Sequence, residues 1–66
     1  MSDVVKNSVQ KIRIAHGLTQ EELAEKVGVS RQTVIAIEKG NYTPSVLLAL
    51  KIAKAFKLQV DDIFSL

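Results

Sequence analysis

The chain has 66 residues, 47% of them hydrophobic, and a formal net charge of +2, which suits a single domain near the lower size limit for a core without disulfides or metals. It contains no cysteine and one histidine, so a disulfide framework, thiol chemistry and a cysteine–histidine metal site are excluded, and a reducing cytoplasm is the expected setting. No apolar run approaches the roughly 20 residues that span a bilayer, and the N-terminus lacks the apolar segment of a signal peptide.

The first predicted element is a helix from about residue 3 or 4 to residue 16. Val5, Val9 and Ile12 lie four and three residues apart, which aligns their side chains along one face of a helix. Gly17 is expected to end this helix. The apolar stripe should then pack against the elements that follow.

A second helix is predicted to begin at Thr19. The Thr19 side chain can cap the helix, and Glu22, three residues later, can reach back to the Thr19 backbone N–H. The inward face of this helix is expected to hold Leu23, Ala24 and Val27.

A tight turn and a third helix follow directly. Gly28 can adopt a positive φ at little cost, so the chain can leave the second helix and turn sharply. Ser30 supplies the next cap, while Val34 and Ile37 give the third helix a buried edge. The segment from Thr19 to Glu38 therefore predicts a helix-turn-helix with one edge of its second helix free to meet a partner.

The fourth predicted helix ends near Phe56, after a loop over residues 40–44. Either Thr43 or Ser45 can cap it, with Pro44 near its first turn. Two apolar stripes are expected to be buried, formed by Val46, Ala49, Leu50 and Ala53 and by Leu48, Ile52 and Phe56, which leaves to water the line of Leu47, Lys51 and Lys54.

The last predicted element is a short helix from Val60 to Phe64. Asp61 and Asp62 lie near its N-terminal end, where negative charge is favoured. No alternation typical of a β-strand competes with these helices, so the chain is predicted to be all-α.

Taken in order, these motifs resemble the phage-repressor and Cro class of helix-turn-helix proteins, also called the xenobiotic-response-element family. The similarity runs from about residue 9 to residue 64 and includes Ile12-Arg13, Gly17-Leu18-Thr19-Gln20, Ile37-Glu38-Lys39-Gly40, Pro44-Ser45 and Val60-Asp61-Asp62-Ile63-Phe64. The resemblance implies a compact five-helix, lambda-repressor-like DNA-binding domain that acts as a symmetric dimer. The sequence departs from the family at Lys57, where a glycine is common, and at Gln59, where a serine or threonine is common.

The residues expected to read bases lie on the outer edge of the third helix. A recognition helix presents polar side chains from its N-terminal end to the major groove. Arg31 suits guanine, Gln32 suits adenine and Ala36 suits a thymine methyl group, while Thr33 suits either a base or a phosphate. The alternative interpretation of this surface is an ordinary solvated helix face.

Contacts to the DNA backbone are expected from residues beside that edge. The resemblance implies that Gln20 touches a phosphate and supports the recognition helix. Lys39 is placed to reach a phosphate, and Asn41, Tyr42 and Thr43 form a second candidate clamp. For Tyr42, a lid over the core is an equally good interpretation.

The resemblance also implies a structural ion pair between Arg13 and Glu38. Glu38 lies beside the buried edge of the third helix, where an unpaired carboxylate would be costly.

A homodimer is expected because a domain this small contacts about one half-site, and two domains must lie about 34 Å apart on one duplex face. The candidate interface residues are Ile63, Phe64 and Leu66, with Leu47 nearby in the family fold. The alternative is that these side chains fold inward.

The sequence therefore predicts a sequence-specific DNA-binding transcriptional regulator that binds a palindromic operator as a homodimer, with repression favoured over activation. No catalytic constellation and no phosphate-binding glycine loop is present, so an enzyme, a metal and a cofactor are not expected. The alternatives are an antitoxin-type interaction protein that binds DNA secondarily, and a domain that uses the motif helices for protein contacts alone.

Overall fold

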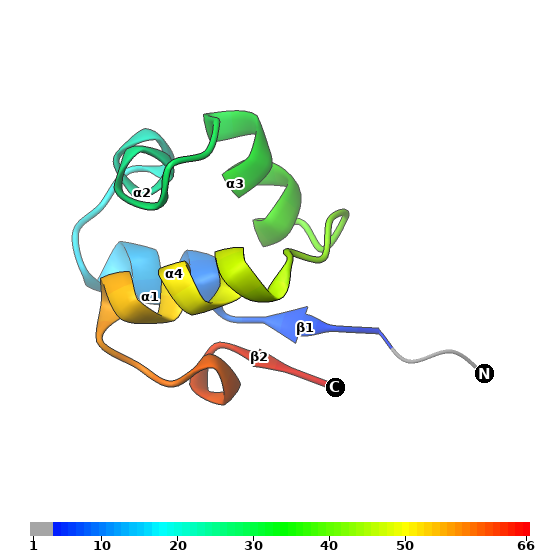
Figure 1. Cartoon of the computed structure of the whole chain (residues 1–66). Helices are drawn as coiled ribbons and strands as arrows, with labels where there is room; N and C mark the ends of the chain where they lie inside the picture. The colour runs from blue at the N-terminus through cyan, green and yellow to red at the C-terminus, as the bar shows by residue number, and fades with distance from the viewer. Residues whose placement is uncertain (1–3) are drawn as a thin grey trace.

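The computed structural model describes residues 4–66, which form a small bundle of helices with a two-stranded sheet at one end (Figure 1). In Figure 1, α2 and α3 lie on one side of the bundle, α1 and α4 on the other, and the sheet lies beyond them. The elements are β1 (Lys6–Asn7), α1 (Val9–Ala15), α2 (Gln20–Val27), α3 (Arg31–Glu38), α4 (Val46–Phe56), the 3-10 helix η1 (Val60–Asp62) and β2 (Phe64–Ser65).

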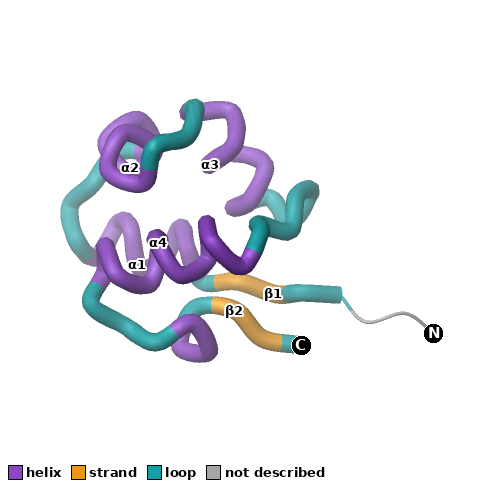
Figure 2. The backbone as a smooth tube through the Cα atoms, in the orientation of Figure 1, coloured by secondary structure: helices purple, strands orange, loops and turns teal. Residues whose placement is uncertain are grey.

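Residues 6–7 form a strand and residues 4–8 contain no helix, so the helix expected from residue 3 or 4 is wrong over residues 4–8. Asp3 lies outside the described residues. β1 pairs antiparallel with β2, with Asn7 opposite Phe64 (Figure 2). The Asn7 side chain accepts a hydrogen bond from the Val9 N–H at 3.1 Å. α1 therefore begins at Val9, and Val5 packs on the core from an extended chain.

The end of the chain also differs from the expectation of a helix through Phe64. η1 covers only residues 60–62, so the described residues contain four α-helices and the expected fifth is not confirmed. The Asp62 carboxylate accepts the Gln59 N–H at 2.9 Å and closes a three-residue turn. Beyond it, Ile63 enters the core and Phe64 pairs with β1, which requires an extended backbone.

The two motif helices are capped as the sequence predicts. Thr19 Oγ1 accepts the Glu22 N–H at 3.0 Å, and Glu22 Oε1 accepts the Thr19 N–H at 2.8 Å. That backbone N–H lowers the pKa of the Glu22 carboxyl group. Gly28 has φ 74°, which turns the chain between the helices, and Ser30 Oγ accepts the Thr33 N–H at 3.2 Å. These local bonds fix where α2 and α3 begin.

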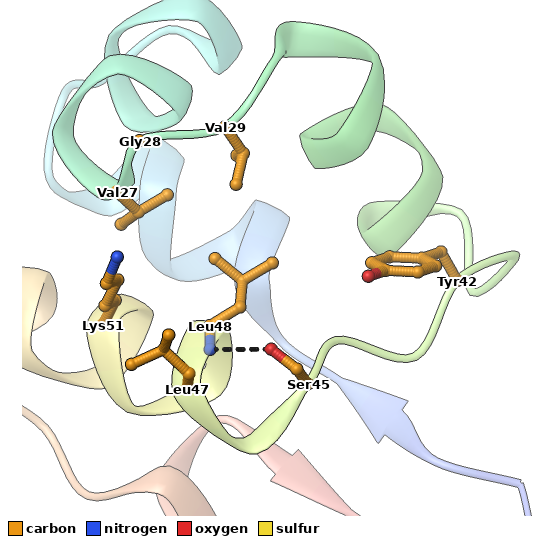
Figure 3. Close-up of a pocket in the computed structure, with 8 residues that line it drawn as sticks. All are labelled: Val27, Gly28, Val29, Tyr42, Ser45, Leu47, Leu48 and Lys51. Carbon is orange, nitrogen blue, oxygen red and sulfur yellow. Dashed lines mark hydrogen bonds between the residues drawn. The ribbon is translucent and has the colours of Figure 1, made fainter.

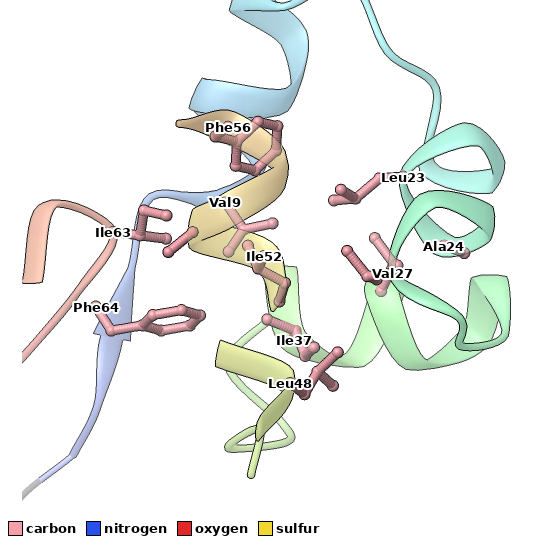
Figure 4. Close-up of a cluster of buried hydrophobic side chains, with 12 residues drawn as sticks. Val9, Leu23, Ala24, Val27, Ile37, Leu48, Ile52, Phe56, Ile63 and Phe64 are labelled. Atoms are coloured by element: carbon pink, nitrogen blue, oxygen red, sulfur yellow. The ribbon is translucent and has the colours of Figure 1, made fainter. Parts of the chain in front are cut away.

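A single core of aliphatic and aromatic side chains joins the four α-helices to the C-terminal segment (Figure 4). The motif contributes its predicted inward residues, and the sheet end contributes Ile63 and Phe64. The buried hydrophobic residues are Val9, Leu23, Ala24, Val27, Val34, Ile37, Leu48, Ile52, Ala53, Phe56, Ile63 and Phe64.

One of the two stripes predicted to be buried on α4 is partly exposed. Leu48, Ile52 and Phe56 are buried, whereas Val46 is 76% exposed and Leu50 is 53% exposed. α4 packs on α2 and η1. Because these elements cover only two sides of the helix, the rest of its surface is exposed to solvent. The apolar strip of α4, defined here as Val46, Leu47 and Leu50, is therefore a surface feature.

The C-terminus of α4 has a lysine in a conformation that favours glycine. Lys57 has φ 58° and ψ 41°. We expect Lys57→Gly to raise the free energy of unfolding by about 0.5 kcal/mol, because relief of roughly 1–2 kcal/mol of strain exceeds the added entropy of a glycine, about 0.5–1 kcal/mol. Urea denaturation measures this change. Lys54→Gly, inside the helix, is the control and should lower the free energy of unfolding. A lower free energy of unfolding for both variants would contradict the conclusion that the Lys57 backbone is strained.

Within residues 4–66, no helix is long and apolar enough to span a bilayer.

Candidate nucleic-acid interface

The outer edge of α3 is open to solvent. Arg31 and Gln32 are exposed and Ala36 is half-buried, whereas Val34 and Ile37 on the inner edge are buried. α3 packs mainly on α2. The helix is therefore held by its inner edge while its first turn and outer edge remain free to enter a groove.

The Thr33 hydroxyl is already engaged. It lies 3.0 Å from the Ser30 hydroxyl, and the Thr33 N–H donates to Ser30 Oγ. Thr33 is half-buried. Of the four residues expected to read bases, Thr33 is thus part of the cap of α3, while Arg31, Gln32 and Ala36 line its outer edge.

Arg13 and Glu38 form an ion pair in the interior, between α1 and α3. Arg13 Nε donates to Glu38 Oε2 at 2.7 Å and Nη2 donates to Oε1 at 3.3 Å. Their side chains are 10% and 3% exposed. Arg13 Nη1 also donates to the Leu18 carbonyl oxygen at 2.7 Å, so one guanidinium ties α1 to the entry of α2 and to the end of α3.

Gln20 joins this pair. Its Nε2 donates to Glu38 Oε1 at 3.0 Å. The sequence predicts Gln20 near DNA and Glu38 in the interior, but contact between the two side chains is not predicted by either assignment. We call Arg13, Glu38 and Gln20 the polar cluster, since it links the first three α-helices.

Asn7 is a second residue that sequence reasoning missed. Its Nδ2 donates to the Ile37 carbonyl oxygen at 2.8 Å, while its Oδ1 accepts the Val9 N–H. One side chain thus bonds both to the first N–H of α1 and to the end of α3. An asparagine side chain commonly accepts the backbone N–H two residues later in an Asx-turn, and this preference is the sequence signal for the first of these bonds.

The polar cluster opens into a surface hollow of about 350 Å³ between the N-terminal ends of α2 and α3. It is lined by Arg13, Thr19, Gln20, Glu21 and Arg31. Arg31 provides a positive side chain, and the N-terminus of α2 favours anions. The exposed acid at this hollow is Glu21. The structure therefore brings Gln20 and Arg31, predicted as phosphate and base contacts respectively, to one place.

The loop after α3 is exposed, as Lys39, Asn41 and Thr43 all are. Tyr42 is 47% exposed, so about half of its surface is covered and the rest is open to solvent. Figure 3 shows its ring at one side of a second hollow, of about 230 Å³, with Lys51 at the other side. This hollow is separate from the one beside Gln20 and is lined by Val27, Gly28, Val29, Tyr42, Ser45, Leu47, Leu48 and Lys51.

The four candidate dimer residues divide into two pairs. Ile63 is 3% exposed and Phe64 is 9% exposed, so both belong to the core of one chain. The prediction that these two residues form the dimer interface is therefore wrong. They fold inward because η1 and β2 carry them under α4 and beside β1. Leu47 is 63% exposed and Leu66 is 74% exposed, which leaves both free to meet another molecule.

Comparison with known proteins agrees with this geometry. The model of the helix-turn-helix family matches residues 9–63. An uncharacterized HTH-type transcriptional regulator of Methanocaldococcus jannaschii is 60% identical over 60 residues, which are 91% of each chain. The cryptic phage CTXphi transcriptional repressor RstR of Vibrio cholerae is 30% identical over 59 residues, 89% of this chain and 53% of RstR.

A solved structure shows the same arrangement of elements. The restriction-modification controller protein C.AhdI of Aeromonas hydrophila superposes with a TM-score of 0.77 at 33% identity, over 82% of each chain. A match of this kind, together with the family match over most of the sequence, identifies both fold and family. The chain therefore belongs to the Cro/C1-type helix-turn-helix family of DNA-binding transcriptional regulators.

Proposed function

We propose that the chain is a single DNA-binding domain that represses transcription by occupying a partly palindromic operator as a homodimer. The observation that carries this proposal is the free outer edge of α3 beside the hollow at the start of α2. One surface thus offers side chains for base edges and donors for the DNA backbone.

Base recognition is assigned to the first turn and outer edge of α3. Arg31 and Gln32 are exposed at the helix start and can each form two hydrogen bonds to one base, guanine and adenine respectively. Ala36 lies one turn later and can contact a thymine methyl group. Thr33 keeps its assignment as a base or phosphate contact, which requires its hydroxyl to donate outward while Ser30 caps the helix.

Backbone contacts are assigned to both sides of that edge. Gln20 and Lys39 flank it, and Asn41, Tyr42 and Thr43 follow in the exposed loop. Such contacts fix the position of the protein on the duplex and carry no sequence information directly.

The interface with the second copy of the chain is assigned to the apolar strip of α4 and to Leu66. Three exposed aliphatic residues within two turns of one helix form a patch that a partner surface would remove from water. A domain with one recognition helix reads one half-site, and a second copy on the same duplex face supplies the other. A symmetric operator requires a symmetric pair, which makes this chain its own partner.

Repression is favoured over activation because occupying an operator is sufficient to block polymerase, with no further contact needed. The similarity to RstR, a phage transcriptional repressor, supports the same sign of regulation.

Selection of bound duplexes from a random DNA pool tests this proposal. We expect a palindromic motif for the wild-type protein. Gln32→Ala should weaken binding by about 1–3 kcal/mol at particular base pairs. Lys39→Ala is the matched control, since loss of a phosphate contact should weaken binding to all sequences alike. Binding that is salt-sensitive but independent of sequence, or no binding, would instead favour a protein partner, as in the antitoxin-type alternative.

A further inference from the structure

Glu38 accepts a hydrogen bond from Gln20, which lines the hollow at the start of α2, but Glu38 is not itself among the residues that line it. We infer that Glu38 is a positioning residue for DNA binding, which holds the Gln20 amide in the orientation that donates to a backbone phosphate. The inference rests on the proposed function. Glu38 would itself touch no DNA and would act through Gln20 alone.

The chemistry of the two groups fixes which end of the amide faces inward. A carboxylate only accepts hydrogen bonds, so the nitrogen of the Gln20 amide must be the atom 3.0 Å from Glu38 Oε1. An amide nitrogen carries two hydrogens. One is used by Glu38, and the second remains for an acceptor in the hollow that Gln20 lines.

Burial makes Glu38 a fixed support. Its side chain is 3% exposed and is held by two bonds from Arg13. A glutamine side chain that is free in solution must be ordered when it binds, which reduces affinity. Holding Gln20 against a fixed carboxylate orders it before DNA arrives.

Arg13 makes this arrangement compatible with an anionic ligand. An unpaired carboxylate behind Gln20 would repel a phosphate, but the Arg13 guanidinium neutralises Glu38 with a two-pronged ion pair. The polar cluster thus presents a neutral donor at its outer end, while Arg31 supplies the positive charge at the hollow.

A purely structural role for Glu38, as a tie between α1 and α3, gives a different result in a double-mutant cycle. In that case the contribution of Gln20 to DNA affinity would be the same whether or not Glu38 is present. If Glu38 positions Gln20, that contribution depends on Glu38.

The experiment measures DNA affinity by fluorescence anisotropy in two protein backgrounds, each called a frame. One frame is the wild-type chain, and the other carries Arg13→Met with Glu38→Met, which removes both charges together. We expect Gln20→Met to weaken binding about fivefold in the first frame, the equivalent of one hydrogen bond, and less than about twofold in the second. Equal losses in both frames would overturn the inference, as would no loss in the wild-type frame. Should the double-methionine frame not fold, Arg13→Leu with Glu38→Leu replaces it in the same cycle, because leucine likewise removes both charges and leaves Gln20 without an acceptor.

Lys39→Gln is the control in each frame, because Lys39 is outside the polar cluster. It should lower the slope of log K against log salt concentration by about 0.9, the value for one phosphate, equally in both frames. Gln20→Met should leave that slope unchanged, since glutamine carries no charge. Failure of the wild-type chain to bind DNA would overturn the proposed function; binding with a Gln20 contribution independent of Glu38 would overturn only the positioning role.

Discussion

Replacing Arg13 by alanine is expected to unfold most of the protein at room temperature. Glu38 would keep a buried carboxylate with no cation, and breaking a buried pair on one side lowers stability by about 3–5 kcal/mol. A single core in a chain of this size supplies about 3–5 kcal/mol in total. The loss should therefore be seen in folding before it is seen in base selectivity, and urea denaturation followed by circular dichroism measures it.

Two further variants isolate the cause of that loss. Lys11→Ala removes an exposed cation from the same helix and should change stability by less than about 0.5 kcal/mol. Arg13→Met combined with Glu38→Met removes both charges and should recover most of the stability, since apolar pairs of similar volume replace buried ion pairs well. A stable Arg13→Ala variant with an altered operator preference would show that Arg13 acts in recognition instead.

The parts of the fold that were predicted correctly from the sequence are those fixed by hydrogen bonds between residues close together in the chain. The caps at Thr19, Ser30 and Ser45, the last being one of two candidates for its helix, each involve a backbone N–H three residues away, so the signal and the structure share one short segment. The turn at Gly28 depends on one residue. Family resemblance added the pairing of Arg13 with Glu38, which spans 25 positions and which spacing alone does not reveal.

The parts that sequence missed depend on neighbours far along the chain. The spacing of Val5, Val9 and Ile12 also fits a strand that leads into a helix, and the choice is made by pairing of β1 with residues near the other terminus. At that terminus, Phe64 pairs with Asn7 across the sheet, which shortens the expected helix. A strand of two residues is too short to show a local sequence pattern that would predict such a pairing.

The candidate site shows the same division. The exposed edge of α3 follows from its periodicity, since Val34 and Ile37 mark the opposite edge. The bond from Gln20 to Glu38 joins residues 18 positions apart and depends on how closely α2 approaches the end of α3. The apolar strip of α4 could not be separated from a buried stripe, because apolar residues cover almost the whole helix and only the neighbouring elements decide which are covered.

Making the apolar strip of α4 polar is expected to abolish tight operator binding while the chain stays folded. The triple variant Val46→Ser, Leu47→Gln and Leu50→Gln changes side chains that are all more than half exposed, so the core is preserved. All three replacements are neutral, so attraction to DNA phosphates is unchanged. The protein should be a monomer by sedimentation. Its affinity for the full palindrome should fall at least about 100-fold, because the two half-sites are then bound independently.

An exposed aliphatic residue away from α4 provides the control. Ile14 on α1 is 60% exposed, and Ile14→Gln should leave both dimerisation and operator affinity unchanged. The triple variant should bind an isolated half-site as well as the wild-type monomer does, since α3 and the polar cluster are untouched. Loss of half-site binding would mean that the strip supports the fold or contacts DNA directly. If the triple variant still sediments as a dimer, the interface does not lie on the apolar strip of α4, and Leu66 is the next residue to test.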